Sequence, residues 1–238
     1  GDEEFKIFKE LSADLVVVVA YGQIIPKKFF NKAKFGFINI HASLLPKWRG
    51  AAPIQRAIMN GDTKTGVSIM RIEEKLDGGP VLSAKELDLD QTTTYGEIEK
   101  KLSELGASVL IESLKKIENG KAKFVDQVHS EATYAKKIDK TETKINWNLD
   151  ANKVIRHIHG LSPNPGAWFE YKNERFKVLR ANKSSAIGRA GSVLDEELTI
   201  GCKSDSIRIL EIQRQGKNKQ TTKEFLLGNK IVNGSILT

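Results

Sequence analysis

Two polar side chains, those of Asn39 and His41, end an apolar stretch, Phe37–His41, that has the composition of a β-strand. Residues two apart on a strand point to the same face, so the amide and the imidazole lie side by side. In open α/β sheets, ligands bind outside the carboxyl ends of the strands. The pair is therefore placed to act on a small polar group such as a carbonyl.

This pair suits direct transfer between two bound substrates. An amide donates to a carbonyl oxygen, and an imidazolium stabilises a developing oxyanion and moves protons. Ser43 follows closely, but the Gly-x-Ser-x-Gly pattern of a nucleophilic serine is absent. The nucleophile must then come from a substrate. Asp77 is a candidate third member, since a carboxylate beside a histidine orients the ring and favours its charged form. Alternatively, Asp77 only forms the turn Asp77-Gly78-Gly79.

Other common kinds of site find little support. His157 and His159 do not share a helix face at their spacing, and no cysteine or histidine cluster lies near them, so we expect no metal site. Cys202 is the single cysteine, which excludes an internal disulfide and favours a small buried residue. Neither a Gly-x-Gly-x-x-Gly nor a Walker sequence supports a dinucleotide or ATP site.

The segments around Asn39 and His41 predict an α/β domain that positions these two residues. The β-branched run Leu15–Ala20 and the stretch Phe37–His41 are typical of strands in a parallel sheet, with a helical segment between them. The domain is completed by a helix over Ala52–Asn60 and by strands over 66–70 and 81–89. A long helix follows, which begins at a capping box at Thr94 and ends at Asn119-Gly120.

The character of the chain changes near Lys121. Residues 121–144 are polar and lysine-rich and are typical of an extended linker. A short helix over 151–160 and several short strand-like runs follow, which predicts a small β-barrel. The expected strands lie at 167–171, 176–179, 191–194, 198–200 and 207–210.

The composition narrows the class of partner. The chain has 238 residues, 39% hydrophobic and 29% charged, with a net charge of +8. Such a charge favours a polyanion, above all nucleic acid, although heavy lysine usage would give the same value. The longest apolar run is too short to span a bilayer, and we find no secretory leader, so we expect a cytoplasmic protein without membrane contact. Because the chain starts without Met, we expect it to lack an upstream segment.

Several motifs resemble those of the methionyl-tRNA formyltransferases of the formyltransferase superfamily, and the resemblance covers nearly the whole chain. The motifs are Asn39–Pro46, Trp48–Gln55, Gly66–Met70, Leu76–Gly79, Tyr134–Ile138, Ile145–Trp147 and Ser162–Ala167.

The resemblance implies a Rossmann-like catalytic domain over 1–120, here N-terminally incomplete, a linker over 121–144 and an OB-like tRNA-binding barrel over 145–238. It implies transfer of the formyl group of 10-formyltetrahydrofolate to methionyl-initiator tRNA for translation initiation. We also expect a monomer that uses no metal. The catalytic set falls on Asn39, His41 and Asp77. The residues implied for folate binding are Ser43, Leu44, Leu45, Pro46, Tyr21, Gly22, Gln23, Ile24 and Ile25.

Two departures from the family pattern stand out. Gly78 follows Asp77 where the family usually has threonine, and the family's first strands and its tRNA-contacting insertion should precede Gly1. Two alternatives stay open: a formyltransferase acting on an amino sugar nucleotide, and a non-catalytic RNA-binding protein.

Overall fold

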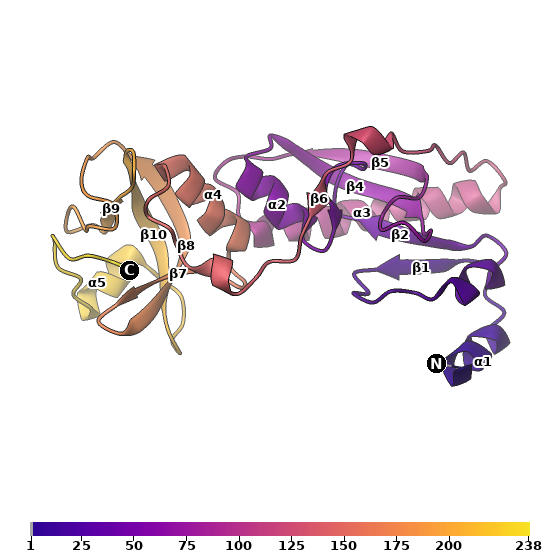
Figure 1. Cartoon of the computed structure of the whole chain (residues 1–238), viewed down its shortest axis with the longest axis horizontal. Coiled ribbons are helices and arrows are strands. Elements are labelled where there is room, and N and C mark those ends of the chain that lie inside the picture. Colours follow the sequence, from indigo (N-terminus) through magenta and orange to yellow (C-terminus); the bar gives the residue numbers. More distant parts are fainter. Residues whose placement is uncertain (1) are drawn as a thin grey trace. The chain divides into compact units, whose positions relative to one another are not determined.

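The computed structural model describes residues 2–238, which form two compact units. The first unit holds residues up to 54, 64–88 and 100–137, and the second holds 55–63, 89–99 and 138–238 (Figure 1). The helices are α1 (Asp2–Glu10), α2 (Pro53–Asn60), α3 (Tyr95–Glu118), α4 (Ala151–Leu161) and α5 (Thr222–Gly228), with 3-10 helices η1 (Lys27–Lys32), η2 (His129–Glu131) and η3 (Thr141–Thr143). Among the residues described, none of the helices is long and apolar enough to cross a lipid bilayer.

The first unit is built on a four-stranded sheet in the order β1-β2-β4-β5. Its strands are β1 (Val16–Val19), β2 (Phe37–His41), β4 (Lys64–Arg71) and β5 (Val81–Asp88), and a separate parallel pair joins β3 (Arg49–Gly50) to β6 (Tyr134–Ala135). The predicted α/β class is confirmed. The sheet is mixed, however: β1 and β2 are parallel, whereas β4 is antiparallel to both β2 and β5. β4 and β5 are joined by a loop too short for the crossover that a parallel pair needs.

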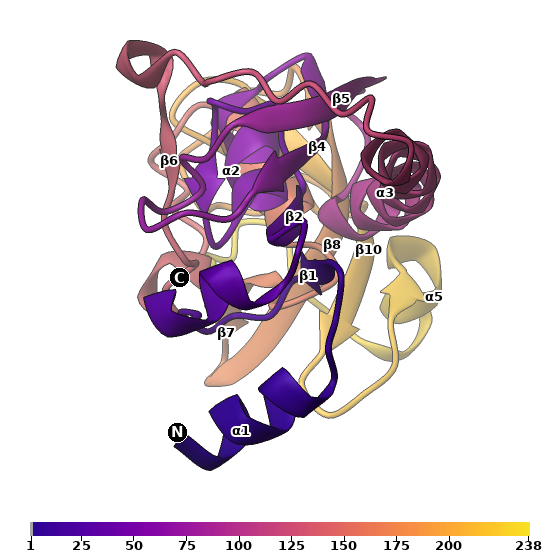
Figure 2. The same ribbon diagram turned by 90° about the vertical axis from the view of Figure 1, so that its right-hand side faces the viewer.

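Helix α3 covers one face of this sheet, and Figure 2 shows it almost end-on beside β4. The buried residues of its part in the first unit follow a helical repeat, with Leu102, Val109 and Ile117 nearly inaccessible. A Cβ added at Gly106 would lie 3.2 Å from the Ile40 side chain, so helix and strand are in close contact there. Because Ile40 faces α3, its neighbours Asn39 and His41 point to the opposite face.

Helix α1 was not expected from the sequence. It contacts η1 and the start of β2 through an aromatic cluster, in which Phe5 and Phe8 lie 5.0 and 5.3 Å from Phe29, and Phe8 lies 5.7 Å from Phe37. These edge-on and tilted contacts leave the rings of Phe5, Phe8 and Phe29 half-buried at the side of the sheet. A nine-residue helix with few apolar positions carries little sequence signal of its own, so this packing decides it.

The second unit contains the predicted antiparallel β domain. Its strands are β7 (Ala167–Tyr171), β8 (Glu174–Ser184), β9 (Thr199–Gly201), β10 (Ser206–Arg214) and β11 (Gln220–Thr221), in the order β11-β10-β8-β7 with β9 also beside β10. Residues 191–194, expected as a strand, form only isolated bridges at Ser192 and Val193.

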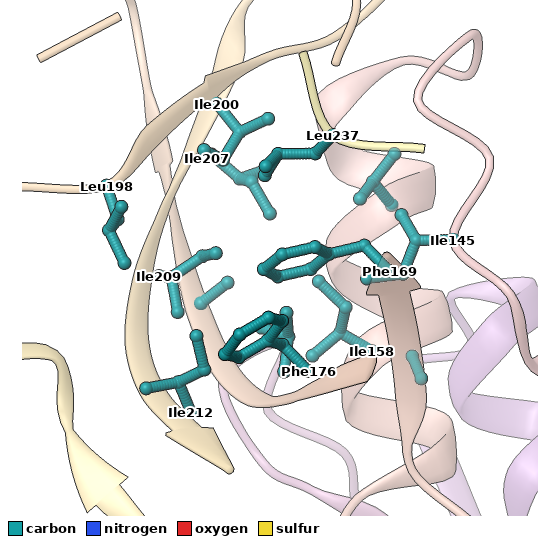
Figure 3. Close-up of a cluster of buried hydrophobic side chains, with 14 of the residues drawn as sticks. Ile145, Ile158, Phe169, Phe176, Leu198, Ile200, Ile207, Ile209, Ile212 and Leu237 are labelled. Carbon is teal, nitrogen blue, oxygen red and sulfur yellow. The ribbon is translucent and has the colours of Figure 1, made fainter. Parts of the chain in front are cut away.

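A dense apolar core holds the second unit together (Figure 3). Phe169 is inaccessible and stacks on Phe176 at 5.5 Å, while Ile158 of α4 lies in the same cluster. Cys202 belongs to this core, and burial raises the pKa of its thiol to about 11. The core therefore needs the inward-facing side chains of α4 and of the sheet together.

Candidate active site

The site starts from the end of β2, where Asn39 and His41 share one face of the strand as the sequence predicts. His41 is 5% exposed, and Asn39 is half-buried. Among the residues described, none forms a hydrogen bond with the Asn39 amide. Both donors of that amide are therefore available to a bound substrate.

Two partners flank the His41 ring. Its Nε2 lies 2.8 Å from the Trp48 carbonyl oxygen, which can only accept, so Nε2 carries a proton and donates. On the other side, Nδ1 lies 3.7 Å from Oδ2 of Asp77. The Asp77 side chain is 15% exposed, so this carboxylate faces the second ring nitrogen in a largely buried setting. The structure thus brings the three predicted catalytic residues into one region of the first unit.

Asp77 is held in a defined position. Its backbone has φ of 45°, a conformation that residues other than glycine seldom adopt and that is enriched at functional sites. The Gly50 N–H donates to the same Oδ2 at 2.8 Å. Gly50 itself has φ of +117°, and a Cβ there would lie 2.8 Å from the Ala135 carbonyl oxygen, so only glycine fits. The Asp77 carboxylate is therefore held by the Gly50 N–H through the same oxygen that faces the His41 ring.

The loop after β2 is held by Ser68, a residue the sequence analysis missed. Ser68 pairs with His41 across the β2–β4 ladder and is fully buried. Its hydroxyl donates to the Ser43 carbonyl oxygen at 2.7 Å and accepts from the Leu45 N–H at 3.1 Å. A polar residue in the middle of the run Val67–Met70, which is otherwise apolar, is the sequence signal that could have identified it.

The two segments predicted to bind folate follow adjacent strands. β1 and β2 are parallel, with Val19 opposite Ile40, so the loops after them leave the same edge of the sheet. Ser43 is buried, and its hydroxyl donates to the Lys47 carbonyl oxygen at 2.6 Å, so that side chain stabilises the loop itself. Tyr21 and Ile24 are 58% and 95% exposed, whereas the segment Leu44–Pro46 is half-buried.

A hollow of about 1060 Å³ lies elsewhere in the first unit. It is lined by residues 30–37 and 71–75, around the start of β2, and none of the predicted site residues lines it. The carboxyl end of β2, not this hollow, carries the cluster of polar groups suited to act on a carbonyl.

Comparisons with known proteins agree with this geometry. The formyl transferase family profile matches residues 2–114, and the profile of the formyl transferase C-terminal domain matches residues 137–230. The chain is 51% identical to the methionyl-tRNA formyltransferase of Pelagibacter ubique, over 99% of this chain and 76% of that protein.

The chain belongs to the methionyl-tRNA formyltransferase family.

A second family member, from Mesorhizobium japonicum, is 43% identical over 98% of this chain and 77% of its own length. Solved structures show the same fold at low identity. HypX from Aquifex aeolicus, in complex with tetrahydrofolic acid, has a TM-score of 0.72 and 20% identity over 97% of this chain and 44% of that chain. WlaRD, a sugar 3N-formyl transferase, has a TM-score of 0.67 and 20% identity over 88% of this chain and 77% of that chain. The family profiles and the two relatives confirm the expected resemblance, and the chain is a formyl-transferring enzyme.

Proposed function

We propose that this enzyme transfers the formyl group of 10-formyltetrahydrofolate to the amino group of methionyl-initiator tRNA, for translation initiation. High identity to family members of that name over nearly the whole chain supports this substrate pair. The observation that carries the chemistry is the side-by-side placement of Asn39 and His41 with Asp77 3.7 Å from the ring.

The reaction follows from these three groups. The methionyl amine attacks the formyl carbon and forms a C–N bond, and the carbonyl oxygen becomes an oxyanion. The Asn39 amide and the His41 imidazolium stabilise this charge, and Asp77 stabilises and orients the imidazolium. As the intermediate collapses, the bond from the formyl carbon to folate N10 breaks, and the proton released by the amine passes to the folate nitrogen.

The present partner of His41 sets one condition on this reaction. The Nε2–H group donates a hydrogen bond to the Trp48 carbonyl oxygen. To stabilise an oxyanion, that proton must be shared with the substrate or released to it.

We assign folate binding to the loops Tyr21–Ile25 and Ser43–Pro46, because both follow the carboxyl ends of the neighbouring parallel strands β1 and β2.

We assign tRNA binding in part to the domain over 145–238, with residues 1–120 as the catalytic domain and 121–144 as the linker. The supporting feature is a basic hollow of about 660 Å³ in the second unit. Trp168 lies on its wall, with the Arg175 guanidinium 4.1 Å and the Lys144 amine 5.3 Å from its ring centroid. Cations held beside an aromatic ring suit both phosphate contact and base stacking.

The test of this function separates chemistry from RNA binding. Purified protein with 10-formyltetrahydrofolate and charged initiator tRNA should form formylmethionyl-tRNA. The variant His41→Ala should bind tRNA as well as the unchanged protein but transfer formyl groups at least about 100-fold more slowly, because it loses an oxyanion donor and a proton acceptor. Unchanged transfer in this variant would refute the assigned role.

Two other functions predict different results. A formyltransferase for an amino sugar nucleotide would show no tRNA binding even at low salt, whereas the proposed enzyme should bind with a steep salt dependence, because basic side chains release counterions from phosphates. A non-catalytic RNA-binding protein would bind tRNA without transfer. We place the reaction in the cytoplasm. We propose that the enzyme is a monomer, and light scattering after size-exclusion chromatography can check this oligomeric state.

A further inference from the structure

The segment 121–137, which lies within the expected linker 121–144, contributes a buried side chain beside the site. Gln127 is 8% exposed, and its Nε2 donates to the carbonyl oxygens of Asp77 and Gly79, at 2.9 and 2.6 Å. These two bonds hold the backbone on both sides of Gly78. The loop that presents the Asp77 carboxylate to His41 is therefore fixed from a segment far along the chain.

Arg49 fixes the orientation of the Gln127 amide. Its Nε and one terminal nitrogen donate to Gln127 Oε1, at 3.1 and 2.6 Å, and that terminal nitrogen also lies 2.9 Å from His129 Nδ1. A guanidinium can only donate, so the amide oxygen must face Arg49 and the amide nitrogen must face the loop. The Arg49 side chain is completely buried, and among the residues described no carboxylate forms an ion pair with it. Its main contacts are thus to Gln127 and His129.

The same segment also holds the second contact of Asp77. β6 pairs with β3, and the Arg49 N–H donates to the Thr133 carbonyl oxygen at 2.9 Å. Gly50, next to Arg49, donates its N–H to Asp77 Oδ2. Both ends of the Asp77 residue, its carbonyl and its carboxylate, are therefore tied to one network.

We propose that Gln127, oriented by Arg49, is a positioning residue that sets the distance between the Asp77 carboxylate and His41. Chemistry makes the choice of residue specific. The position must accept from a guanidinium and donate to two carbonyl oxygens, and a terminal amide does both, whereas a carboxylate accepts only and a thioether does neither well. This role rests on the proposed function, because it acts through the Asp77–His41 pair.

The test uses two substitutions of similar size. Gln127→Glu keeps the contact to Arg49 and removes both donors, and Gln127→Met removes donors and acceptor without adding charge. We expect each to lower kcat about 10- to 100-fold with KM for both substrates little changed, as a misplaced catalytic group does. The matched control is Asn119→Asp, an exposed amide that donates to the Lys115 carbonyl oxygen at 2.8 Å and should leave kcat within twofold of the unchanged protein.

A double-mutant cycle separates positioning from general support of the fold. In the Asp77→Asn background, Gln127→Glu should change kcat less than about twofold, because the group that it positions has already lost its charge. Equal losses in both backgrounds would overturn the proposal, and so would unchanged kcat in both single variants. Failure of both variants to fold would also overturn it, since Gln127 would then be a structural residue.

A second readout does not need the reaction. If Gln127 holds the Asp77 loop, the Gly50 amide proton, which donates to Asp77, should exchange with solvent faster in Gln127→Met than in the unchanged protein. Unchanged exchange would contradict the positioning role. If the unchanged protein forms no formylmethionyl-tRNA, the proposed substrate pair fails, while this exchange measurement still decides the role of Gln127.

Discussion

The substitution Asp77→Asn tests the electrostatic part of the site most directly. Asparagine has the shape of aspartate, and its side-chain oxygen can still accept from the Gly50 N–H, a bond of 2.8 Å in the structure. What disappears is the negative charge 3.7 Å from His41 Nδ1. The variant therefore isolates the effect of the charge from that of the loop conformation.

The magnitude follows from this distance. Two unit charges 3.7 Å apart interact by about 4 kcal/mol at an effective dielectric constant near 20. Both side chains are largely buried, at 6% and 15% exposure, so solvent screens the pair only weakly. Since about 1.4 kcal/mol corresponds to a factor of ten, we expect kcat to fall about 100- to 1000-fold if the imidazolium forms in the transition state.

The assay is single-turnover formation of acid-stable formylmethionyl-tRNA at saturating folate. Asp77→Ala should be slower than Asp77→Asn, because it also loses the contact to Gly50. Asp88→Asn, an exposed position on β5, serves as the control and should react like the unchanged protein. A kcat for Asp77→Asn within threefold of the unchanged protein would refute the electrostatic argument.

Two further predictions concern the second unit. Phe169→Ala should lower the free energy of unfolding by about 3–5 kcal/mol in chemical denaturation, because the ring is inaccessible and stacked in the core. The control is Ile187→Ala, at a position 92% exposed, which should change this free energy by less than about 0.5 kcal/mol. Burial lowers the pKa of His159 below its usual value of 6.5, so the unfolded chain takes up a proton more readily than the folded one, and stability should fall as pH drops below about 6.5. Between pH 7.5 and 5, the free energy of unfolding of the unchanged protein should fall by up to about 2 kcal/mol more than that of His159→Asn. Parallel plots of this free energy against pH for the two proteins would contradict the prediction.

The sequence predicted well those elements whose signal is local. β2 and β7 have the bounds expected from their strand-like composition, and α4 extends the predicted helix by a single residue. α5 was missed although Thr221 and Glu224 form a capping box, since a seven-residue helix gives too short a repeat to recognise. Residues 191–194 pair only through isolated bridges, Ser192 with Ile236 and Val193 with Ile200, so no continuous strand ladder forms there.

The sequence by itself determined that Asn39 and His41 share a face, because the period of two is a property of any extended chain. It also identified Asp77 as a third polar group in a glycine-rich loop. Only the tertiary structure decided that Asp77 faces Nδ1 of His41, that the Trp48 carbonyl oxygen accepts a hydrogen bond from Nε2, and that Gln127 holds the loop from 50 residues away. Those contacts arise because buried polar groups must find partners, and the partners come from whichever segments the fold brings near.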